Sequence, residues 1–172
     1  MSTGIDDGVV IRLDKENMKF SAGHFTIFGP GDRERLHGHN FKVAVTLHAC
    51  VGANGLCFDY GIYKDRVVAL CRELNEYFLL PGRSPLLRIE EGGDAVTAVF
   101  GGERIPFLRG DVLVLPITNV TLEELAGYLL GRLLADPDAI AGHGIDAIEV
   151  SVASGPGQDA TRRWRALAAG AR

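Results

Sequence analysis

"SAGHFTIFGPGDRERLHGHNF", residues 21–41, holds three of the five histidines of the chain. His37 and His39 flank a single glycine, and His24 precedes a turn rich in glycine and proline. Side chains two positions apart on a β-strand point to the same face, so His37 and His39 project together if this segment is extended. A hairpin at the turn places His24 on the neighbouring strand, where a register step or a bulge aligns it with the pair.

Three neutral imidazoles that converge on one point form an open zinc site, with a fourth position left for water or substrate. The alternative is a chance pattern on a strand without any metal, and the spacing alone leaves both interpretations open. His48 and His143 fall outside the cluster. We interpret His48 as a solvent-facing strand residue and His143 as a loop residue.

The segments around this stretch predict strands and two helices. Residues 8–28 are expected to form one long strand, and "HGHNFKVAVTLHACV" alternates between apolar and polar residues as a second strand does. Residues 61–79 carry an apolar stripe at helical spacing. A second helix begins at Thr121, which forms a capping box with Glu124, and Pro137 is expected to end it.

Short alternating runs over about residues 84–116 predict a small β-meander inserted between the helices. Two further strands follow in "IDAIEVSVA" and "DATRRWRAL". The resulting order, ββααββ plus the insert, predicts an α+β fold, an antiparallel four-stranded sheet with two helices on one side. No repeat or linker divides residues 1–172, so a single domain is expected. Oligomerisation is one way to close the open sheet edges.

Composition narrows the classes of partner. The net charge of -4 and the pI of about 5.7 argue against nucleic acid as a partner. No apolar run approaches the roughly 18 residues that a membrane span needs. No signal peptide is visible, and three cysteines without a CxxC pair predict free buried thiols in a reducing compartment. We therefore expect a cytoplasmic protein with no membrane partner.

At these residues the chain resembles the 6-pyruvoyltetrahydropterin synthase / 6-carboxytetrahydropterin synthase family. The matching motifs are "FSAGHF", "LHGHNF", "GLCFDYGIYK", "TLEELA" and the last strand pair. The resemblance implies the tunnelling fold, in which subunits pool strands into a barrel and trimers stack into homo-hexamers. It also implies Zn²⁺ on His24, His37 and His39, with 7,8-dihydroneopterin triphosphate as substrate and active sites at subunit interfaces.

In the family, zinc acidifies the side-chain hydroxyls of the pterin, and a Cys base with an Asp–His pair moves the protons. This chain departs from that pattern in three places. Arg33 stands where the Cys is usual, and Asn75 and Glu76 stand where the Asp–His pair is usual. Ala153 and Ser154 occupy the positions of the glutamate that anchors the pterin ring.

Some family members without the Cys carry Glu three residues before HGH, and the resemblance implies that they shorten the pterin side chain to a hydroxymethyl group. Glu34 has this place here, and partial burial can raise the pKa of such a base. Its alternative is an exposed turn residue within "DRER". Glu123, together with Thr121, matches the substrate-binding motif of the family, although an acid in a first helical turn also complements the helix dipole.

Two functions follow. The first is a zinc-dependent carbon–oxygen or carbon–carbon lyase that acts on 7,8-dihydroneopterin triphosphate or a close relative, with Glu34 as the catalytic base. The alternative is a zinc-loaded pterin- or purine-binding homologue without lyase activity, because the usual catalytic set is replaced. A weaker third possibility is another reaction on a related heterocycle, with the meander reshaping the pocket.

Overall fold

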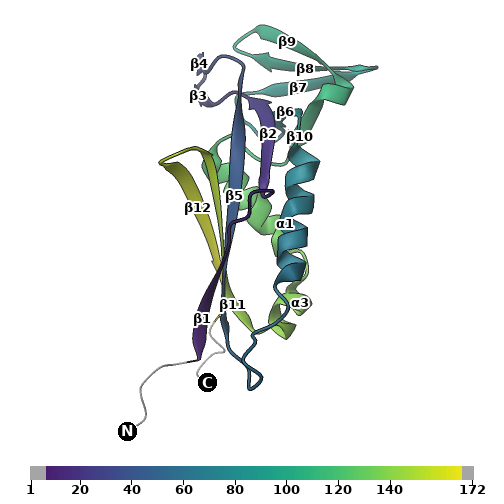
Figure 1. The fold of residues 1–172 in the computed structure, drawn as a ribbon. Helices are drawn as coiled ribbons and strands as arrows, with labels where there is room; N and C mark the ends of the chain where they lie inside the picture. The colour runs from purple at the N-terminus through teal and green to yellow at the C-terminus, as the bar shows by residue number, and fades with distance from the viewer. Residues whose placement is uncertain (1–6, 168–172) are drawn as a thin grey trace.

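A seven-stranded sheet forms the body of the computed structural model, which describes residues 7–167 (Figure 1). Its strands are β1 (Gly8–Leu13), β2 (Lys19–His24), β5 (His37–Cys50), β6 (Tyr77–Pro81), β10 (Val112–Leu115), β11 (Ile145–Gly155) and β12 (Gln158–Arg165). The spatial order is β10-β6-β2-β5-β11-β12, and β1 pairs with β5 beyond the part that β2 covers. The long strand β5 is therefore the central strand, since it pairs with β1, β2 and β11.

The observed sheet corrects the expectation of four antiparallel strands. The expected four-stranded antiparallel part exists as β2, β5, β11 and β12, but β6 runs parallel to both β2 and β10. The predicted helix stops at Leu74, because Glu76 adopts a positive φ of 66° and the chain then turns into β6. Phe78 lies on that strand, not on a helical stripe. Periodicity cannot separate a short apolar strand from the end of a helix.

Residues 7–167 contain three α-helices where two were expected: α1 (Gly61–Leu74), α2 (Leu122–Leu133) and the short α3 (Pro137–Gly142). Thr121 caps α2 as predicted, since its hydroxyl accepts from the Glu124 amide at 3.3 Å. The other half of the predicted capping box differs, because the Glu124 carboxylate accepts from the amide and hydroxyl of Thr118. Pro137 does not end α2 but begins α3, because proline in a first turn loses no hydrogen bond.

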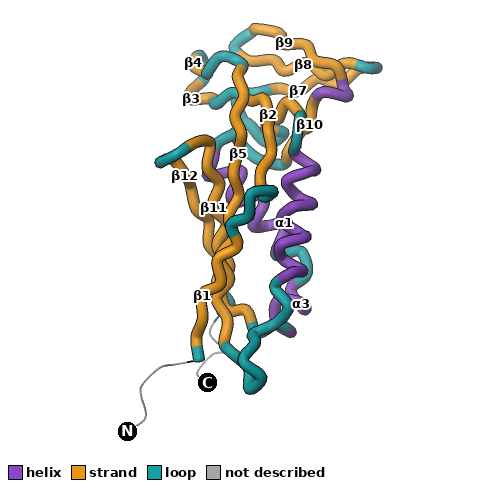
Figure 2. Tube along the Cα trace, in the orientation of Figure 1, coloured by secondary structure: helices purple, strands orange, loops and turns teal. Residues whose placement is uncertain are grey.

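The N-terminal segment is divided rather than continuous. A polar turn around Lys15 and Met18 separates β1 from β2, and the Met18 amide donates to the Lys15 carbonyl at 3.0 Å. After β2, the short strands β3 (Ile27–Gly29) and β4 (Asp32–Arg33) pair as a hairpin. Figure 2 shows this hairpin at one end of the molecule, between β2 and β5, the strands on which the three histidines lie.

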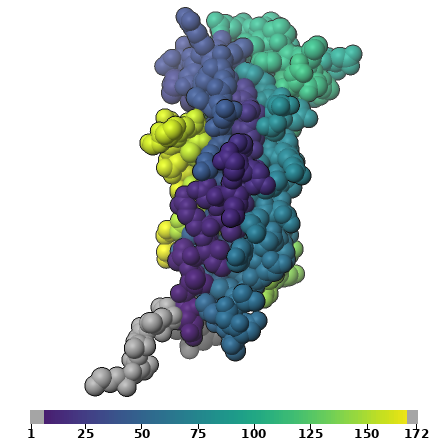
Figure 3. Space-filling model, viewed as in Figure 1, coloured from purple at the N-terminus to yellow at the C-terminus, as the bar shows by residue number. Residues whose placement is uncertain are grey.

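The predicted meander exists as a separate three-stranded sheet of β7 (Arg88–Gly92), β8 (Ala95–Phe100) and β9 (Glu103–Leu108). A 3₁₀ turn, η1 (Arg109–Asp111), follows, and β10 then joins the main sheet instead of the meander. The space-filling view places the meander beside the β3–β4 hairpin at one end of the molecule (Figure 3).

One apolar cluster lies between the main sheet and the helices, and a second lies at the meander. In the larger one, α1 and α2 pack against the face of β5 that carries Phe41, Val43, Val45 and Leu47, as the alternation predicts. The smaller cluster joins the meander to the hairpin, and its buried residues are Phe25, Ile27, Leu80, Leu87, Val96, Ala98, Phe100 and Val112. The histidine-bearing end of β2 and β5 lies between them.

The structure bears on two expectations from composition, the absence of a membrane span and the presence of free buried thiols. Within residues 7–167, no helix has both the length and the apolar character that crossing a membrane requires. All three cysteines are free, but only Cys71 is buried, whereas Cys57 is half-buried and Cys50 is exposed. The cytoplasmic location stays a prediction.

Candidate metal centre

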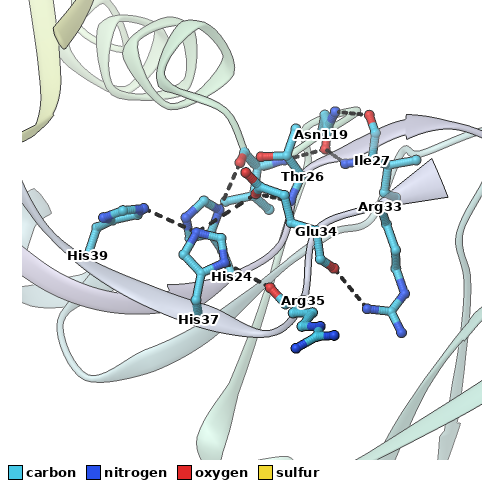
Figure 4. A network of polar contacts seen from close by, with 10 residues as sticks. His24, Thr26, Ile27, Arg33, Glu34, Arg35, His37, His39 and Asn119 are labelled. Atoms are coloured by element: carbon cyan, nitrogen blue, oxygen red, sulfur yellow. Dashed lines mark hydrogen bonds and ion pairs between the residues drawn. The ribbon is translucent and has the colours of Figure 1, made fainter.

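The pairing of β2 with β5 brings the three histidines together (Figure 4). His24 lies directly opposite His37 in the antiparallel register of β2 and β5, and the expected irregularity occurs in the β3–β4 hairpin between them, where the register shifts between Ile27 and Gly29. The ring centroid of His24 is 4.5 Å from that of His37 and 5.3 Å from that of His39. The predicted convergence on the core face of β5 is therefore found.

Two facing glycines allow this approach. Gly23 pairs with Gly38, the residue between His37 and His39. A Cβ atom on Gly23 would stand 2.5 Å from Cδ2 of Phe78, and one on Gly38 would stand 3.2 Å from the Ala22 carbonyl oxygen. Side chains at these positions would force neighbouring groups apart, so the glycine of HGH has a steric reason.

Backbone carbonyls orient two of the imidazole rings. The Nδ1 atom of His24 lies 3.0 Å from the Val120 carbonyl oxygen, and that of His37 lies 2.8 Å from the Arg35 carbonyl oxygen. A carbonyl can only accept, so Nδ1 carries the proton in each ring and Nε2 keeps a free lone pair. These are the tautomers that present Nε2 to a metal ion.

The free nitrogens face one another. The Nε2 atoms of His37 and His39 are 3.1 Å apart, and one potential ligand atom from each of the three rings lies within 4.8 Å of the others. Among residues 7–167, Nε2 of His24 is the buried side-chain polar atom without a hydrogen-bond partner. Burial, and then the nearby His37, lowers the pKa of His24, which favours the neutral ring that a metal needs. The trio fits a metal ion.

Glu34 lies beside this cluster in the loop between β4 and β5. Its Oε2 atom is 3.8 Å from Nε2 of His37 and accepts from the Thr26 amide at 2.8 Å. Burial alone would raise the pKa of the Glu34 carboxyl, but the hydrogen bond from Thr26 and the nearby histidines outweigh it, so the pKa is lowered. The expected upward shift is therefore wrong, and the group is a carboxylate at neutral pH.

Sequence patterns did not reveal Asn119, which connects the hairpin to the loop before α2. Its amide nitrogen donates to the Ile27 carbonyl at 2.8 Å, and its Oδ1 accepts from the amides of Ile27 at 3.1 Å and Val120 at 3.0 Å. Asn119 thus fixes the segment whose Val120 carbonyl holds His24. No local pattern links positions 92 residues apart.

A cavity of about 390 Å³ opens beside the histidines. It gathers the predicted site residues Glu34, Thr121 and Glu123 with His24 and His39. Residues of β3, β5, β11, β12, the start of α2 and the loops complete its wall: Thr26, Phe28, Phe41, Val120, Leu122, Ser154, Gln158, Asp159 and Ala160. No local pattern indicates Gln158 or Asp159, because their place in the cavity wall depends on the pairing of β12 with β11.

Three residues that differ from the usual family pattern, Asn75, Glu76 and Arg33, lie outside this cavity wall. Asn75 and Glu76 do not line this cavity but fasten β2 to the end of α1. Oδ1 of Asn75 accepts from the Ser21 amide at 2.9 Å, and the Glu76 amide donates to the Ser21 carbonyl at 2.7 Å. The Arg33 side chain turns toward the meander. Glu76 is exposed as expected, but at a turn and not on a helix.

The chain is similar to known pterin synthases over most of its length. It is 29% identical over 147 residues to a putative 6-carboxy-5,6,7,8-tetrahydropterin synthase of Methanocaldococcus jannaschii, covering 85% of this chain and 90% of that protein. The crystal structure of 6-pyruvoyl tetrahydropterin synthase from Plasmodium vivax matches with a TM-score of 0.88 at 29% identity, covering 94% of this chain and 100% of that one.

Two further P. vivax structures, in which a catalytic glutamate is replaced by Ala or Cys, match equally well, with a TM-score of 0.88. The P. falciparum 6-pyruvoyl tetrahydropterin synthase has a TM-score of 0.89 at 27% identity, again over 94% of this chain and 100% of that one. The family model for 6-pyruvoyl tetrahydropterin synthase matches residues 13–163, so the chain belongs to the 6-pyruvoyl tetrahydropterin synthase family.

Proposed function

We propose that the protein is a zinc-dependent lyase that acts on 7,8-dihydroneopterin triphosphate or a close relative. His24, His37 and His39 would hold Zn²⁺ and leave a fourth position for the substrate. The unpartnered, buried Nε2 atom of His24 carries this proposal. Such an atom costs about 1–3 kcal/mol when it lacks a partner, and a metal ion between the three rings removes that cost.

The donor set suits zinc in particular. Two nitrogens at the usual distances from a tetrahedral zinc ion are about 3.3 Å apart, and the Nε2 atoms of His37 and His39 are 3.1 Å apart. Three histidine ligands with an open fourth position are one of the donor sets found in catalytic zinc sites. When bound, zinc polarises the hydroxyl or carbonyl oxygens of a substrate and makes their protons easier to remove.

Glu34 would be the base that accepts such a proton. Its carboxylate lies in the same cavity as His24 and His39, and the lowered pKa keeps it ionised at neutral pH. The Thr26 amide holds one carboxylate oxygen, which leaves the other oxygen able to accept a proton. The similar P. vivax synthase has a catalytic glutamate, which supports a carboxylate base in this chain, where Arg33 occupies the position of the usual Cys and Glu34 follows it.

Glu123 and Thr121 would bind the heterocycle. Glu123 is exposed on the first turn of α2, and its carboxylate can accept the paired N–H groups of an aminopyrimidinone ring. The Thr121 hydroxyl accepts from the Glu124 amide and keeps its own O–H for donation to the substrate. Both residues line the same cavity as Glu34 and His24.

The assembly would be a homo-hexamer in the cytoplasm. In the described part of the chain, β1 pairs only with β5 and β12 pairs only with β11, so each leaves one edge open. Open edges are stable when another subunit pairs with them. Light scattering of the purified protein tests this proposal, and a monomer at micromolar concentration would contradict it.

Turnover by the zinc-loaded protein tests the function directly. We expect 7,8-dihydroneopterin triphosphate to be consumed, with products identified by chromatography and mass spectrometry. Glu34→Gln should lower kcat by about 10²–10⁴-fold, the usual contribution of a general base, without changing zinc content. Glu73→Gln is the matched control, because Glu73 pairs with Arg132 far from the cavity.

An unchanged substrate after hours at one zinc per subunit would contradict the lyase assignment. Calorimetry then separates the remaining cases. Pterin binding without turnover would identify a binding homologue, and no binding would exclude pterins as ligands.

A further inference from the structure

Arg33 connects the meander to the loop that carries Glu34. One nitrogen of its guanidinium, Nη2, lies 2.7 Å from Oε2 of Glu103 on β9, and the other, Nη1, donates to the Glu34 carbonyl at 2.9 Å. The Arg33 side chain is 19% exposed although Glu103 is 65% exposed. A largely covered guanidinium thus divides its donors between the meander and the residue that carries the carboxylate.

Two aromatic rings, one from the segment before β3 and one from the meander, lie near this guanidinium. Its Cζ atom is 5.3 Å from the ring centroid of Phe25 and 5.9 Å from that of Phe100, the last residue of β8. Phe25 and Phe100 belong to the small apolar cluster that joins the hairpin to the meander. Rings at these distances attract a cation and restrict where it can move. Arg33 is therefore held from two sides.

The contact is particular to this place in the meander. Of the ion pairs formed within residues 7–167, the one between Arg33 and Glu103 is the pair that links the meander and its 3₁₀ turn to another part of the chain, since Arg109 of that turn pairs with Glu91 of the meander itself. Pairs such as Arg104 with Glu90 lie entirely inside the meander. The β8–β9 turn also approaches the hairpin, because a Cβ atom on Gly101 would stand 3.7 Å from the Pro30 carbonyl oxygen.

Glu34 itself has three hydrogen bonds that fix it. Its amide donates to the Thr26 carbonyl at 2.9 Å, its carboxylate accepts from the Thr26 amide at 2.8 Å, and its carbonyl accepts from Arg33. Figure 4 shows Arg33 on the side of Glu34 away from the histidines. The backbone of Glu34 is therefore held on one side by Thr26 and on the other by Arg33.

We propose that the meander positions the base: Glu103 and Phe100 hold Arg33, and Arg33 holds Glu34 so that its carboxylate faces the histidine cluster. Arg33 and Glu103 are then positioning residues for the site. This inference rests on the proposed role of Glu34. It assigns a purpose to the meander and to the arginine that stands in the place of the usual Cys.

The test compares Glu103→Gln and Arg33→Met with the control Arg104→Met, all as zinc-loaded full-length protein. Amide hydrogen exchange at Glu34 reports the bond to the Thr26 carbonyl without requiring activity. We expect exchange at Glu34 to become about tenfold faster in both variants and to stay within about twofold of wild type in the control. Zinc content should not change.

Kinetics provide the second measurement. We expect kcat to fall by about 10–100-fold in Arg33→Met, since small displacements of a reacting group have effects of this size, while KM stays within about twofold. Glu103→Gln should have a smaller effect of the same kind, because it keeps the side-chain shape and removes the charge. An equal loss in the control would indicate general destabilisation and overturn the proposal.

The two proposals can fail separately. Unchanged exchange at Glu34 in both variants overturns the positioning role, whatever the activity. Faster exchange with unchanged kcat shows that the contact holds the loop but does not serve catalysis, which also overturns it. If wild type consumes no pterin triphosphate, the proposed function fails, and the exchange data still decide whether the meander holds Glu34.

Discussion

The two ends of β5 carry histidines in opposite situations. Near one end, His37 and His39 lie beside His24 of β2, whose buried Nε2 atom has no hydrogen-bond partner. Near the other end, Nε2 of His48 lies 3.1 Å from Oε1 of Glu149 on β11, across the paired strands. The comparison teaches that a histidine on this strand becomes a candidate ligand where its surroundings leave a lone pair free.

The neighbours of each end explain the difference. At the His48 end, β11 and β12 supply side chains, and Glu149 pairs with Arg163 as well as with His48. At the other end, loops supply backbone carbonyls, which bond Nδ1 of His24 and of His37 and direct the opposite nitrogens inward. A strand neighbour thus satisfies the imidazole of His48, whereas loop carbonyls orient the imidazoles of His24 and His37.

Removing one cluster histidine should have the largest effect. We expect His24→Ala to weaken zinc binding by more than about 100-fold, beyond the 10–100-fold that loss of a supporting group causes, and to abolish turnover. His48→Ala should keep one zinc per subunit, because its nitrogen already has Glu149 as a partner. Metal content after dialysis measures both. Equal zinc retention in the two variants would remove the distinction between the two ends.

A smaller effect is expected from the residue that supports His24. Asn119→Ala removes three hydrogen bonds to the backbone of Ile27 and Val120. We expect zinc affinity to fall by about 10–100-fold and the free energy of unfolding to fall by about 1–3 kcal/mol. Zinc titration and chemical denaturation measure the two quantities.

Asn54→Ala is the matched control, since Asn54 accepts a backbone hydrogen bond from Leu56 far from the cavity. If Asn119→Ala lowers stability but leaves zinc affinity unchanged, the Val120 carbonyl is not what orients His24. That result would leave the register of β2 with β5 as the only cause of the convergence of the three histidines.

The smallest effect is expected at the far end of the strand. His48→Gln should lower the free energy of unfolding by about 1 kcal/mol or less, since its ion pair is partly exposed and Glu149 keeps Arg163 as a partner. Thermal unfolding at constant pH measures this change. A loss as large as that of Asn119→Ala would mean that the contact between His48 and Glu149 stabilises the fold as much as the Asn119 hydrogen bonds beside the histidine cluster do.

Much of the site could be predicted from local pattern. The alternation of β5 correctly placed His37 and His39 on the core face, and Thr121 caps α2 as its motif predicts. The sheet could be predicted less well, since the apolar run of β6 also fits a helix and β10 also fits the meander. The downward pKa shift of Glu34 depends on Thr26, whose position no pattern indicates.

The sequence by itself determined that His37 and His39 share a face and that His24 lies on the adjoining strand. The physical reason is that the two-residue period of a strand and the reach of a short hairpin are local properties of the backbone. Only the tertiary structure decided which imidazole nitrogens stay free, because the Val120 carbonyl that fixes the tautomer of His24 lies 96 residues away along the chain. It also decided how Arg33, between Glu103 and Glu34, joins the meander to the site.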